Sequence, residues 1–183
     1  MLLDAIRSGN LDQVRDLLAA DPSLSQTRTD QGASAVLWSV YTGHAELAPL
    51  LLGDRDPDIF EACALGRADV VAAELASDPT LINAPSPDGF TPLGFAAFFR
   101  HPEVVELLLD RGADPSLPAG NATKYSPLHS AASSNSFEIV DLLLSRGADP
   151  NSREATGTTP LATATANRNQ KIIDRLLAAG ATL

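Results

Sequence analysis

Cysteine, aromatic residues and long apolar runs are all scarce in this sequence of 183 residues. Its single cysteine, Cys63, excludes an intramolecular disulfide and a multi-cysteine zinc site. Aromatic residues make up only 5% of the chain, so a core has to consist mainly of Leu, Ala and Val. No run of residues approaches the roughly 20 apolar positions that a transmembrane helix needs. The sequence therefore predicts neither a disulfide scaffold nor a membrane span.

Basic residues, and lysine above all, are also few. The 13 Lys and Arg residues stand against 23 Asp and Glu residues, which gives a formal net charge of −10. Nucleic acids and anionic membranes carry charge of the same sign, so we expect neither as a partner. Eleven of the 13 basic residues are arginine, which favours a GC-rich bacterial genome as the source. Asp4 and Arg7 interrupt the apolar N-terminal residues, a pattern that predicts no secretion signal or membrane anchor and favours a cytoplasmic protein.

Three segments of the chain, residues 89–115, 124–150 and 157–181, repeat one pattern. A leucine near the start of each recurs at steps of 35 and 33 residues, and a glycine near the end recurs at the same steps. These markers are Leu93, Leu128, Leu161, Gly112, Gly147 and Gly180. Weaker copies begin upstream, and the second of them is about ten residues shorter. The periodicity predicts one domain, residues 1–183, of six repeats with approximate ranges 1–28, 29–55, 56–85, 86–120, 121–153 and 154–183.

Each repeat predicts a pair of helices. The first helix is short and rich in small residues such as Ala96 and Ala97, and a glycine or polar residue separates it from the second. The separating residues are expected at Gly43, Gly66, Arg100 and Asn135. The second helix is apolar over most of its circumference and ends at a glycine with a left-handed backbone, at Gly112, Gly147 and Gly180. Stacked pairs bury apolar faces that one pair cannot, so the sequence predicts an elongated solenoid in which these leucines lie between helix layers: Leu108, Leu143 and Leu177.

The fourth and fifth repeats resemble a known family. Residues 89–93 read Gly-Phe-Thr-Pro-Leu, residues 112–114 read Gly-Ala-Asp, and residues 126–129 read Ser-Pro-Leu-His. These motifs are similar to the signature of the ankyrin repeat, although the first three repeats have other residues where that signature has proline. The resemblance implies an all-α ankyrin-repeat solenoid of helix–turn–helix units with short β-hairpin-like fingers. Residues 53–58 are too few for a finger, which predicts a gap in the row of fingers between repeats two and three.

The residues that could carry chemistry are expected to be structural. His44 and His101 begin second helices, and His129 occupies the signature position, where the resemblance implies a hydrogen bond at the base of a finger. Cys63 falls among close-packed first-helix residues and is expected to be a buried, unreactive thiol. The sequence contains no nucleophile elbow, no HExxH pair and no P-loop. We therefore expect no catalytic residue, no cofactor and no metal site.

One cluster of carboxylates, formed by Asp54, Asp56, Asp58 and Glu61, has the alternation of a calcium-binding loop. Such a loop needs Gly at its sixth position and Glu at its twelfth, and this segment has neither. Asp58 and Glu61 fit better as the N-cap of a helix and its capping-box partner three residues later.

The resemblance places the binding surface on the finger tips and on two positions that follow the small residues of each first helix. In repeats two to five those positions include Tyr41, Leu65, Phe98, Phe99, Ser133 and Ser134. The finger residues Phe90 and Tyr125 extend the apolar part of this surface, whereas Trp38 and Phe95 occupy a neighbouring position that is normally core. Exposed aromatic residues in a groove are typical of binding hot spots. The alternative is that Phe98 or Phe99 packs beneath a finger.

Together these patterns predict a non-catalytic protein–protein interaction module that binds a basic or neutral partner protein through its concave groove and finger tips. A homodimer closed by the aromatic patch is one alternative. A small-ligand or enzymatic domain is disfavoured, because the repeats occupy the chain and leave no insertion that could hold an active site.

Overall fold

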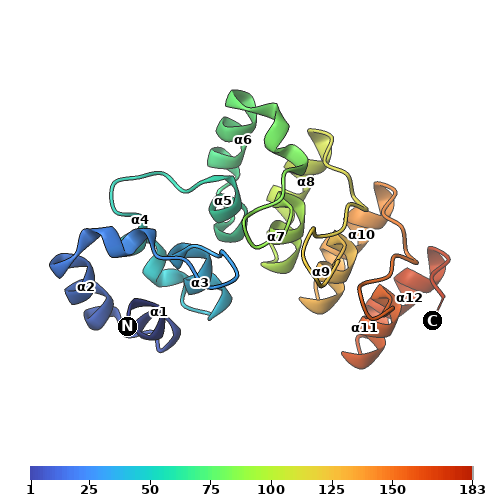
Figure 1. Ribbon diagram of the computed structural model, residues 1–183. Helices are drawn as coiled ribbons and strands as arrows, with labels where there is room; N and C mark the ends of the chain where they lie inside the picture. The colour runs from blue at the N-terminus through green and yellow to red at the C-terminus, as the bar shows by residue number, and fades with distance from the viewer. Residues whose placement is uncertain (183) are drawn as a thin grey trace.

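The computed structural model describes residues 1–182 and is built almost wholly from pairs of helices stacked side by side (Figure 1). The first helices of the pairs are α1 (Leu2–Arg7), α3 (Ala35–Tyr41), α5 (Ile59–Leu65), α7 (Pro92–Phe98), α9 (Pro127–Ser133) and α11 (Pro160–Ala166). The second helices are α2 (Leu11–Ala20), α4 (Ala48–Leu52), α6 (Ala68–Ser77), α8 (Pro102–Asp110), α10 (Phe137–Ser145) and α12 (Gln170–Ala178). Short 3-10 turns follow or precede three of them, η1 (Pro22–Gln26), η2 (Ala45–Leu47) and η3 (Pro79–Asn83). The predicted all-α solenoid is confirmed, and one pair falls in each expected repeat segment, whose exact boundaries stay a prediction.

The first helices begin where a short polar side chain can close their first turn. Ser34, Thr91, Ser126 and Thr159 each accept a hydrogen bond from the backbone N–H three residues later, and the last three are followed by proline at the first helical position. Such a cap is worth about 1 kcal/mol, and proline at this position brings the backbone angle that the helix needs. The Thr-Pro-Leu and Ser-Pro-Leu motifs are therefore helix-start signals with a local physical cause.

The predicted turns and helix ends are confirmed by the backbone. Gly112, Gly147 and Gly180 follow second helices with φ angles of +91°, +87° and +87°. The separating residues between paired helices also have positive φ, at Gly43, Gly66, Arg100 and Asn135. At Gly66 the neighbouring repeat leaves no room either, because an added Cβ would lie 2.5 Å from Nδ1 of His101. The ring of His101 is held there by a hydrogen bond of 3.0 Å between its Nε2 and the carbonyl oxygen of Ala64.

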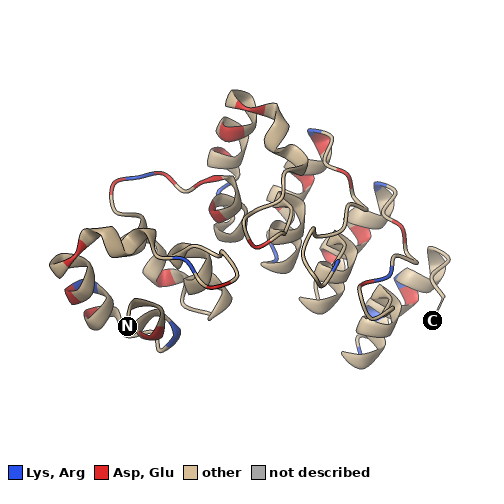
Figure 2. Cartoon of the chain, viewed as in Figure 1, with Lys and Arg blue, Asp and Glu red and all other residues tan. Residues whose placement is uncertain are grey.

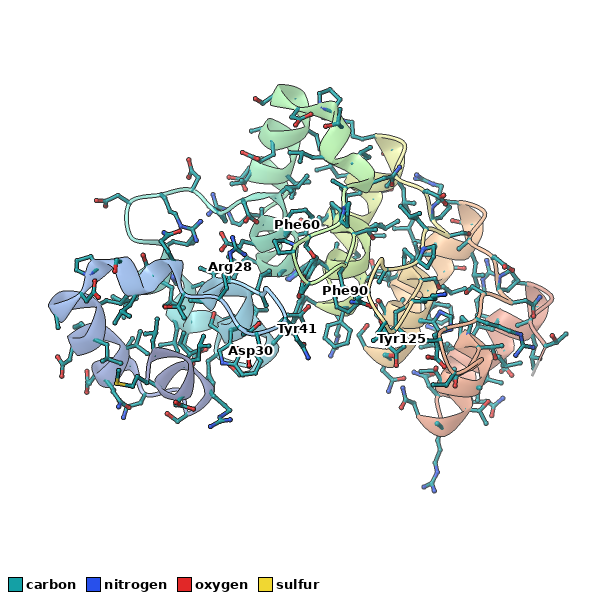
Figure 3. The ribbon with its side chains drawn as sticks, viewed as in Figure 1. Arg28, Asp30, Tyr41, Phe60, Phe90 and Tyr125 are labelled. Carbon is teal, nitrogen blue, oxygen red and sulfur yellow. The ribbon has the colours of Figure 1, made fainter. Side chains whose placement is uncertain are left out.

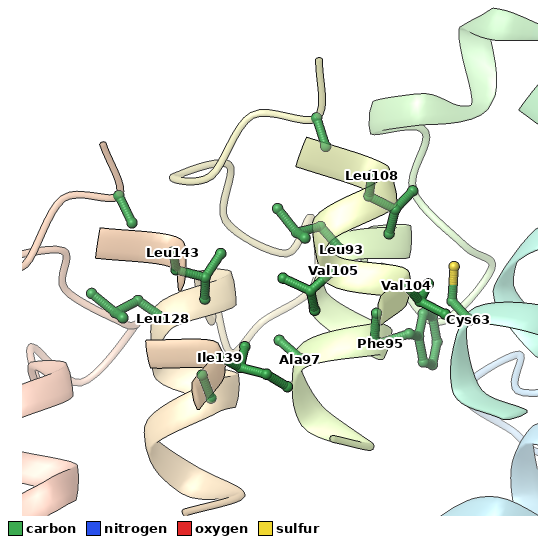
Figure 4. Close-up of a cluster of buried hydrophobic side chains, with 14 of the residues drawn as sticks. Cys63, Leu93, Phe95, Ala97, Val104, Val105, Leu108, Leu128, Ile139 and Leu143 are labelled. Atoms are coloured by element: carbon green, nitrogen blue, oxygen red, sulfur yellow. The ribbon is translucent and has the colours of Figure 1, made fainter. Parts of the chain in front are cut away.

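The main core runs along the stack between the two helix layers, from the third helix to the last (Figure 4). Leu108 and Leu143 are fully buried, as predicted, but the prediction for Leu177 is wrong, because its side chain is 52% exposed. Leu176, one residue earlier, is the buried equivalent and lies 33 residues after Leu143, the same step as the glycine markers. A shift of one residue turns a helical side chain by about 100°, which moves it from the core to the surface.

The connection between α4 and α5, residues 53–58, forms no finger, so the predicted gap is confirmed (Figure 1). The fingers on either side of it, residues 27–34 and 84–91, come into contact instead. A Cβ on Gly32 would lie 2.9 Å from the carbonyl oxygen of Pro87. Within residues 1–182 the fingers contain no β-strand, and one isolated antiparallel bridge joins Arg28 and Ser34. The fingers are thus tight turns with hairpin-like hydrogen bonds.

An ion pair joins the connection 53–58 to α5, with a buried carboxylate and a partly exposed arginine. Glu61 in α5 is 1% exposed, and its carboxylate accepts hydrogen bonds of 2.7 Å from Arg55 Nη1 and 2.7 Å from Ser34 Oγ. Burial raises the pKa of Glu61, but the hydrogen bonds from Arg55 and Ser34 outweigh burial and leave that pKa below its usual value. Glu61 also forms the expected capping box with Asp58.

Acidic side chains outnumber basic ones along the length of the stack (Figure 2). No helix in residues 1–182 combines the length and the apolar character needed to cross a bilayer.

Candidate partner-binding groove

A groove runs between the fingers and the first helices over the N-terminal two thirds of the stack. Its volume is about 990 Å³. It is bordered by residues of α1, of the finger 27–34, of α3 and of the two following fingers, among them Asp4, Arg7, Asp30, Trp38, Tyr41, Asp88, Phe90 and Thr123. Figure 3 shows Asp30, Tyr41 and Phe90 near one another in the middle of the stack. The gap in the row of fingers therefore does not divide the groove, since the neighbouring fingers meet across it.

A smaller pocket of about 240 Å³ opens beside this groove. Five aromatic side chains line it together with Gly94 and Thr123, namely Tyr41, Phe90, Phe95, Phe98 and Tyr125. Tyr41, Phe90 and Thr123 border both the groove and the pocket, so the two hollows adjoin. The result is an extended channel with one aromatic side pocket.

Helix α7 supplies the floor and one wall of this aromatic pocket. Phe95 and Phe98 are three residues apart and so lie on one face of the helix. Phe95 is 2% exposed and packs edge-on against Phe90, with ring centroids 5.7 Å apart. Phe98 is 41% exposed, which leaves much of its ring open to a partner. Gly94 contributes no side chain, so the space above the first turn of the helix stays free.

Tyr41, the last residue of α3, joins the pocket to the groove. Its hydroxyl donates a hydrogen bond of 3.1 Å to Oδ2 of Asp88, which lies at the tip of the finger 84–91. Burial, with the neighbouring Asp88 carboxylate, raises the pKa of Tyr41 well above its usual range, so the phenol stays neutral and remains a donor. The finger tip is held in turn by Asn121, whose side-chain nitrogen donates a 2.8 Å hydrogen bond to the carbonyl oxygen of Asp88. The pocket is therefore formed before any partner arrives.

The carboxylates of the groove are only partly balanced by basic residues. Of the charged side chains that border it, Asp4, Asp30 and Asp88 are acidic and Arg7 is basic. Asp4 pairs with Arg7 at 2.9 Å and with the N-terminal amine at 2.6 Å, so its negative charge is offset. Asp30 and Asp88 are left to give the groove a negative potential.

Four of the residues predicted to bind a partner line the aromatic pocket together: Tyr41, Phe90, Phe98 and Tyr125. Phe99 lies behind them, half-buried, with its ring 5.3 Å from Tyr41 and parallel to Phe95 at 6.3 Å. Phe99 therefore packs against residues of α3 and α7 and supports the wall, whereas Phe98 is 41% exposed.

The structure places the other three predicted residues apart from the pocket. Leu65 packs against a second apolar cluster formed by the N-terminal helices. Ser133 and Ser134 border neither hollow, and the Ser134 hydroxyl donates a 3.0 Å hydrogen bond to the carbonyl oxygen of Ala97 in the preceding repeat. A role for these residues in binding stays a prediction.

Sequence reasoning missed two acidic and two aromatic residues of the groove. Asp30 and Asp88 stand at finger tips, which the repeat pattern predicts to be exposed. Their negative charge could therefore have indicated an acidic groove from the sequence alone. Phe95 is in the core as expected, and its buried ring also forms the floor of the pocket, whereas Trp38 is half-buried and borders the groove. The indole N–H of Trp38 donates a 3.0 Å hydrogen bond to the carbonyl oxygen of Leu3, which fixes the ring at the groove wall.

The residues expected to be structural have that role. Cys63 is fully buried, and burial raises the pKa of its thiol far above its usual value. His129 is buried, which lowers its pKa, and its ring nitrogens lie 2.8 Å from Ser126 Oγ and 2.9 Å from the carbonyl oxygen of Thr158. In the described part of the chain, no group of three or more His, Cys, Asp and Glu side chains is placed to hold a metal ion.

Comparison with known proteins finds the same family along the chain from residue 2 to residue 183. The family model described as ankyrin repeats (3 copies) matches residues 2–119, 59–154 and 117–183. A probable E3 ubiquitin-protein ligase of Oryza sativa subsp. japonica, XBOS32, is 30% identical over 118 residues, which are 61% of this chain and 24% of that protein. The alpha-latrocrustotoxin-Lt1a of Latrodectus tredecimguttatus is 36% identical over 113 residues, 57% of this chain and 8% of the toxin.

A human relative, the DNA-binding protein RFXANK, is 39% identical over 61 residues, 33% of this chain and 24% of that protein. The chain thus spans less than a quarter of the length of these relatives, and the likeness is confined to their repeats. Because the family model matches from residue 2 to residue 183, the chain belongs to the ankyrin-repeat family.

Proposed function

We propose that this chain is a non-catalytic interaction module that binds a basic segment of a partner protein in the groove between its fingers and first helices. Ankyrin repeats are generally protein-interaction modules and generally lack catalytic activity. The observation that carries the proposal is Phe98, 41% exposed at the mouth of an aromatic pocket that opens onto an acidic groove. An exposed ring in such a place is costly in water and gains most from being covered by a partner.

The packing around the pocket supports binding without a large conformational change. Tyr41 is fixed by Asp88, and Phe95 and Phe99 are held by ring contacts behind the surface. Rigid aromatic side chains lose little entropy when a partner covers them, which is why binding hot spots are rich in them. The acidic residues of the groove favour a basic segment over nucleic acid, whose phosphates they would repel.

The proposal is tested by capturing partners with the wild-type chain and with two matched variants. Phe98→Ala removes an apolar side chain at the pocket mouth, and Leu177→Ala removes one of similar exposure, 52%, on the outer helix α12. Loss of a central aromatic typically costs a complex about 2 kcal/mol or more, which is roughly a 30-fold loss of affinity. We expect Phe98→Ala to lose the partner and Leu177→Ala to keep it, with unchanged circular dichroism spectra for both.

The opposite pattern, in which Leu177→Ala loses the partner and Phe98→Ala keeps it, would place the binding surface on the outer helices and end the proposal. Light scattering with size-exclusion chromatography tests the homodimer. A concentration-dependent dimer that Phe98→Ala converts to monomer would show that a second copy of the chain occupies the groove.

A further inference from the structure

We infer that the aromatic pocket is the subsite for one arginine side chain of the partner segment; the inference rests on the proposed function and names the residue that the pocket selects. The pocket is a side branch of the groove, since Tyr41, Phe90 and Thr123 border both. A segment lying along the groove would therefore send one side chain into it. The character of that side chain follows from the walls of the pocket and the charges beside it.

The walls consist mainly of aromatic rings, with hydroxyl groups on Tyr41, Tyr125 and Thr123. Five of the seven residues that line the pocket are aromatic, and none of the seven is basic. A cation over an aromatic face is attracted by the negative potential of the ring, and the attraction grows when water is displaced. Because Phe95 is buried and the other rings are partly covered, a cation inside the pocket would be desolvated on several sides.

A carboxylate stands at the junction of pocket and groove. Asp88 accepts hydrogen bonds from the hydroxyls of Tyr41 and Ser86. An ionised carboxylate can accept about four hydrogen bonds, so two further positions are open to a donor from the partner. The groove adds Asp30, and its only basic residue, Arg7, is already paired with Asp4. A positive side chain in the pocket therefore meets complementary charge, whereas an acidic one is repelled.

Arginine fits these walls better than lysine or an apolar residue. Its guanidinium is planar and weakly hydrated, stacks on aromatic faces and can direct its N–H groups to a carboxylate at the edge. An ammonium group is more strongly hydrated than a guanidinium and cannot stack flat on a ring, so it gains less from these walls, although the hydroxyls of Tyr41, Tyr125 and Thr123 and the Asp88 carboxylate can accept its hydrogen bonds. An apolar side chain would fill the pocket but would leave the Asp88 carboxylate without a positively charged partner.

The test uses peptides selected on the 183-residue chain from a random dodecapeptide display library. We expect selected peptides to carry a net positive charge and an arginine at one recurring position. A synthetic copy of the strongest binder is then compared with versions that carry citrulline, lysine or leucine at that position, by isothermal titration. Citrulline has nearly the shape of arginine but no charge, and we expect it to weaken binding about 5- to 30-fold. Lysine should lie between arginine and citrulline.

Tyr125→Leu tests where the arginine binds, because it keeps an apolar wall and removes one aromatic ring at the half-buried edge of the pocket. We expect it to reduce the preference for arginine over citrulline at least threefold, with Leu177→Ala as the control that leaves the preference unchanged. Binding that is lost on Phe98→Ala but is equal for arginine and citrulline would overturn the subsite and leave the proposed function standing. An arginine preference untouched by Tyr125→Leu would also overturn it, because the arginine would then bind elsewhere. Failure of the wild-type chain to select any peptide would count against both.

Discussion

Replacing Leu143 with alanine is expected to destabilise the protein strongly and to leave the groove intact. Leu143 lies in α10, is fully buried, and packs in the core cluster that contains Leu108, Leu128 and Ile139 (Figure 4). The substitution removes three carbon atoms from this site, which at about 0.8 kcal/mol each amounts to roughly 2.4 kcal/mol of lost burial. The cavity left behind adds up to about 2 kcal/mol. The free energy of unfolding should therefore fall by roughly 2.5–4.5 kcal/mol.

Leu177→Ala is the matched control for this change. It is the same substitution in the corresponding helix of the last repeat, at a side chain that is 52% exposed. Substitutions at such exposed positions change stability by about 0.5 kcal/mol or less. The two variants thus differ in burial and not in chemistry.

Thermal and urea unfolding followed by circular dichroism at 222 nm measures both variants. For a chain of this length, each kcal/mol shifts the melting temperature by about 2–4 °C, so Leu143→Ala should melt roughly 5–18 °C lower than the wild type. Because repeats are coupled to their neighbours, amide hydrogen exchange should show the loss of protection centred on α9 to α12. A melting temperature within about one degree of the wild type, or an equal loss in Leu177→Ala, would refute the assignment of the core.

Gly66→Ala should lower the free energy of unfolding, measured in urea, by at least about 1 kcal/mol more than Gly43→Ala. Both glycines have positive φ, but only at Gly66 would the new Cβ meet the histidine ring of a neighbouring repeat, at 2.5 Å. Cys63 should react with a thiol reagent orders of magnitude more slowly in the native protein than in urea, measured by absorbance, since it is fully buried and burial raises its pKa. Arg55→Ala should lower the free energy of unfolding by roughly 3 kcal/mol at pH 7, because it leaves the buried Glu61 carboxylate without its cationic partner. In the wild type the folded-state pKa of Glu61 lies below its usual value, so the stabilisation by this carboxylate is present above about pH 4.5 and is lost as the pH falls further. In Arg55→Ala that pKa rises, so the variant gains stability as the pH falls. The difference in the free energy of unfolding between the wild type and Arg55→Ala should therefore be smaller at pH 5 than at pH 7.

The local structure of this protein was predictable because its causes are local. A polar cap, a proline at the first helical position and a glycine with positive φ each act within one turn of backbone, so Thr91, Pro92 and Gly112 mark their helix boundaries wherever the repeat is placed. Periodicity then fixed the stacking, since equivalent helices in successive repeats must bury equivalent faces. The helical solenoid and the burial of Cys63 follow from these two rules, whereas the gap in the row of fingers and the structural role of His129 were implied by the resemblance to the ankyrin repeat.

The same rules located part of the binding surface and misplaced the rest. Tyr41 and Phe98 hold the same position in repeats two and four, and their rings lie 6.4 Å apart across the small Ala64 of repeat three. Leu65 holds the next position in repeat three, the one equivalent to Phe99, and packs toward the N-terminal helices. Leu177 was misassigned by a single residue, an error that the 33-residue step from Leu143 to Leu176 would have corrected.

Contacts between segments distant in the sequence were decided only by the tertiary structure. The hydrogen bond from Tyr41 to Asp88 spans 47 residues, and the one from Ser34 to Glu61 spans 27. Both depend on where the fingers come to rest once the finger between them is missing, and no local propensity encodes that position. The sequence by itself determined a stack of helix pairs with a row of aromatic residues. Packing of side chains across the shortened repeat determined that those aromatics enclose a pocket and that a carboxylate stands beside it.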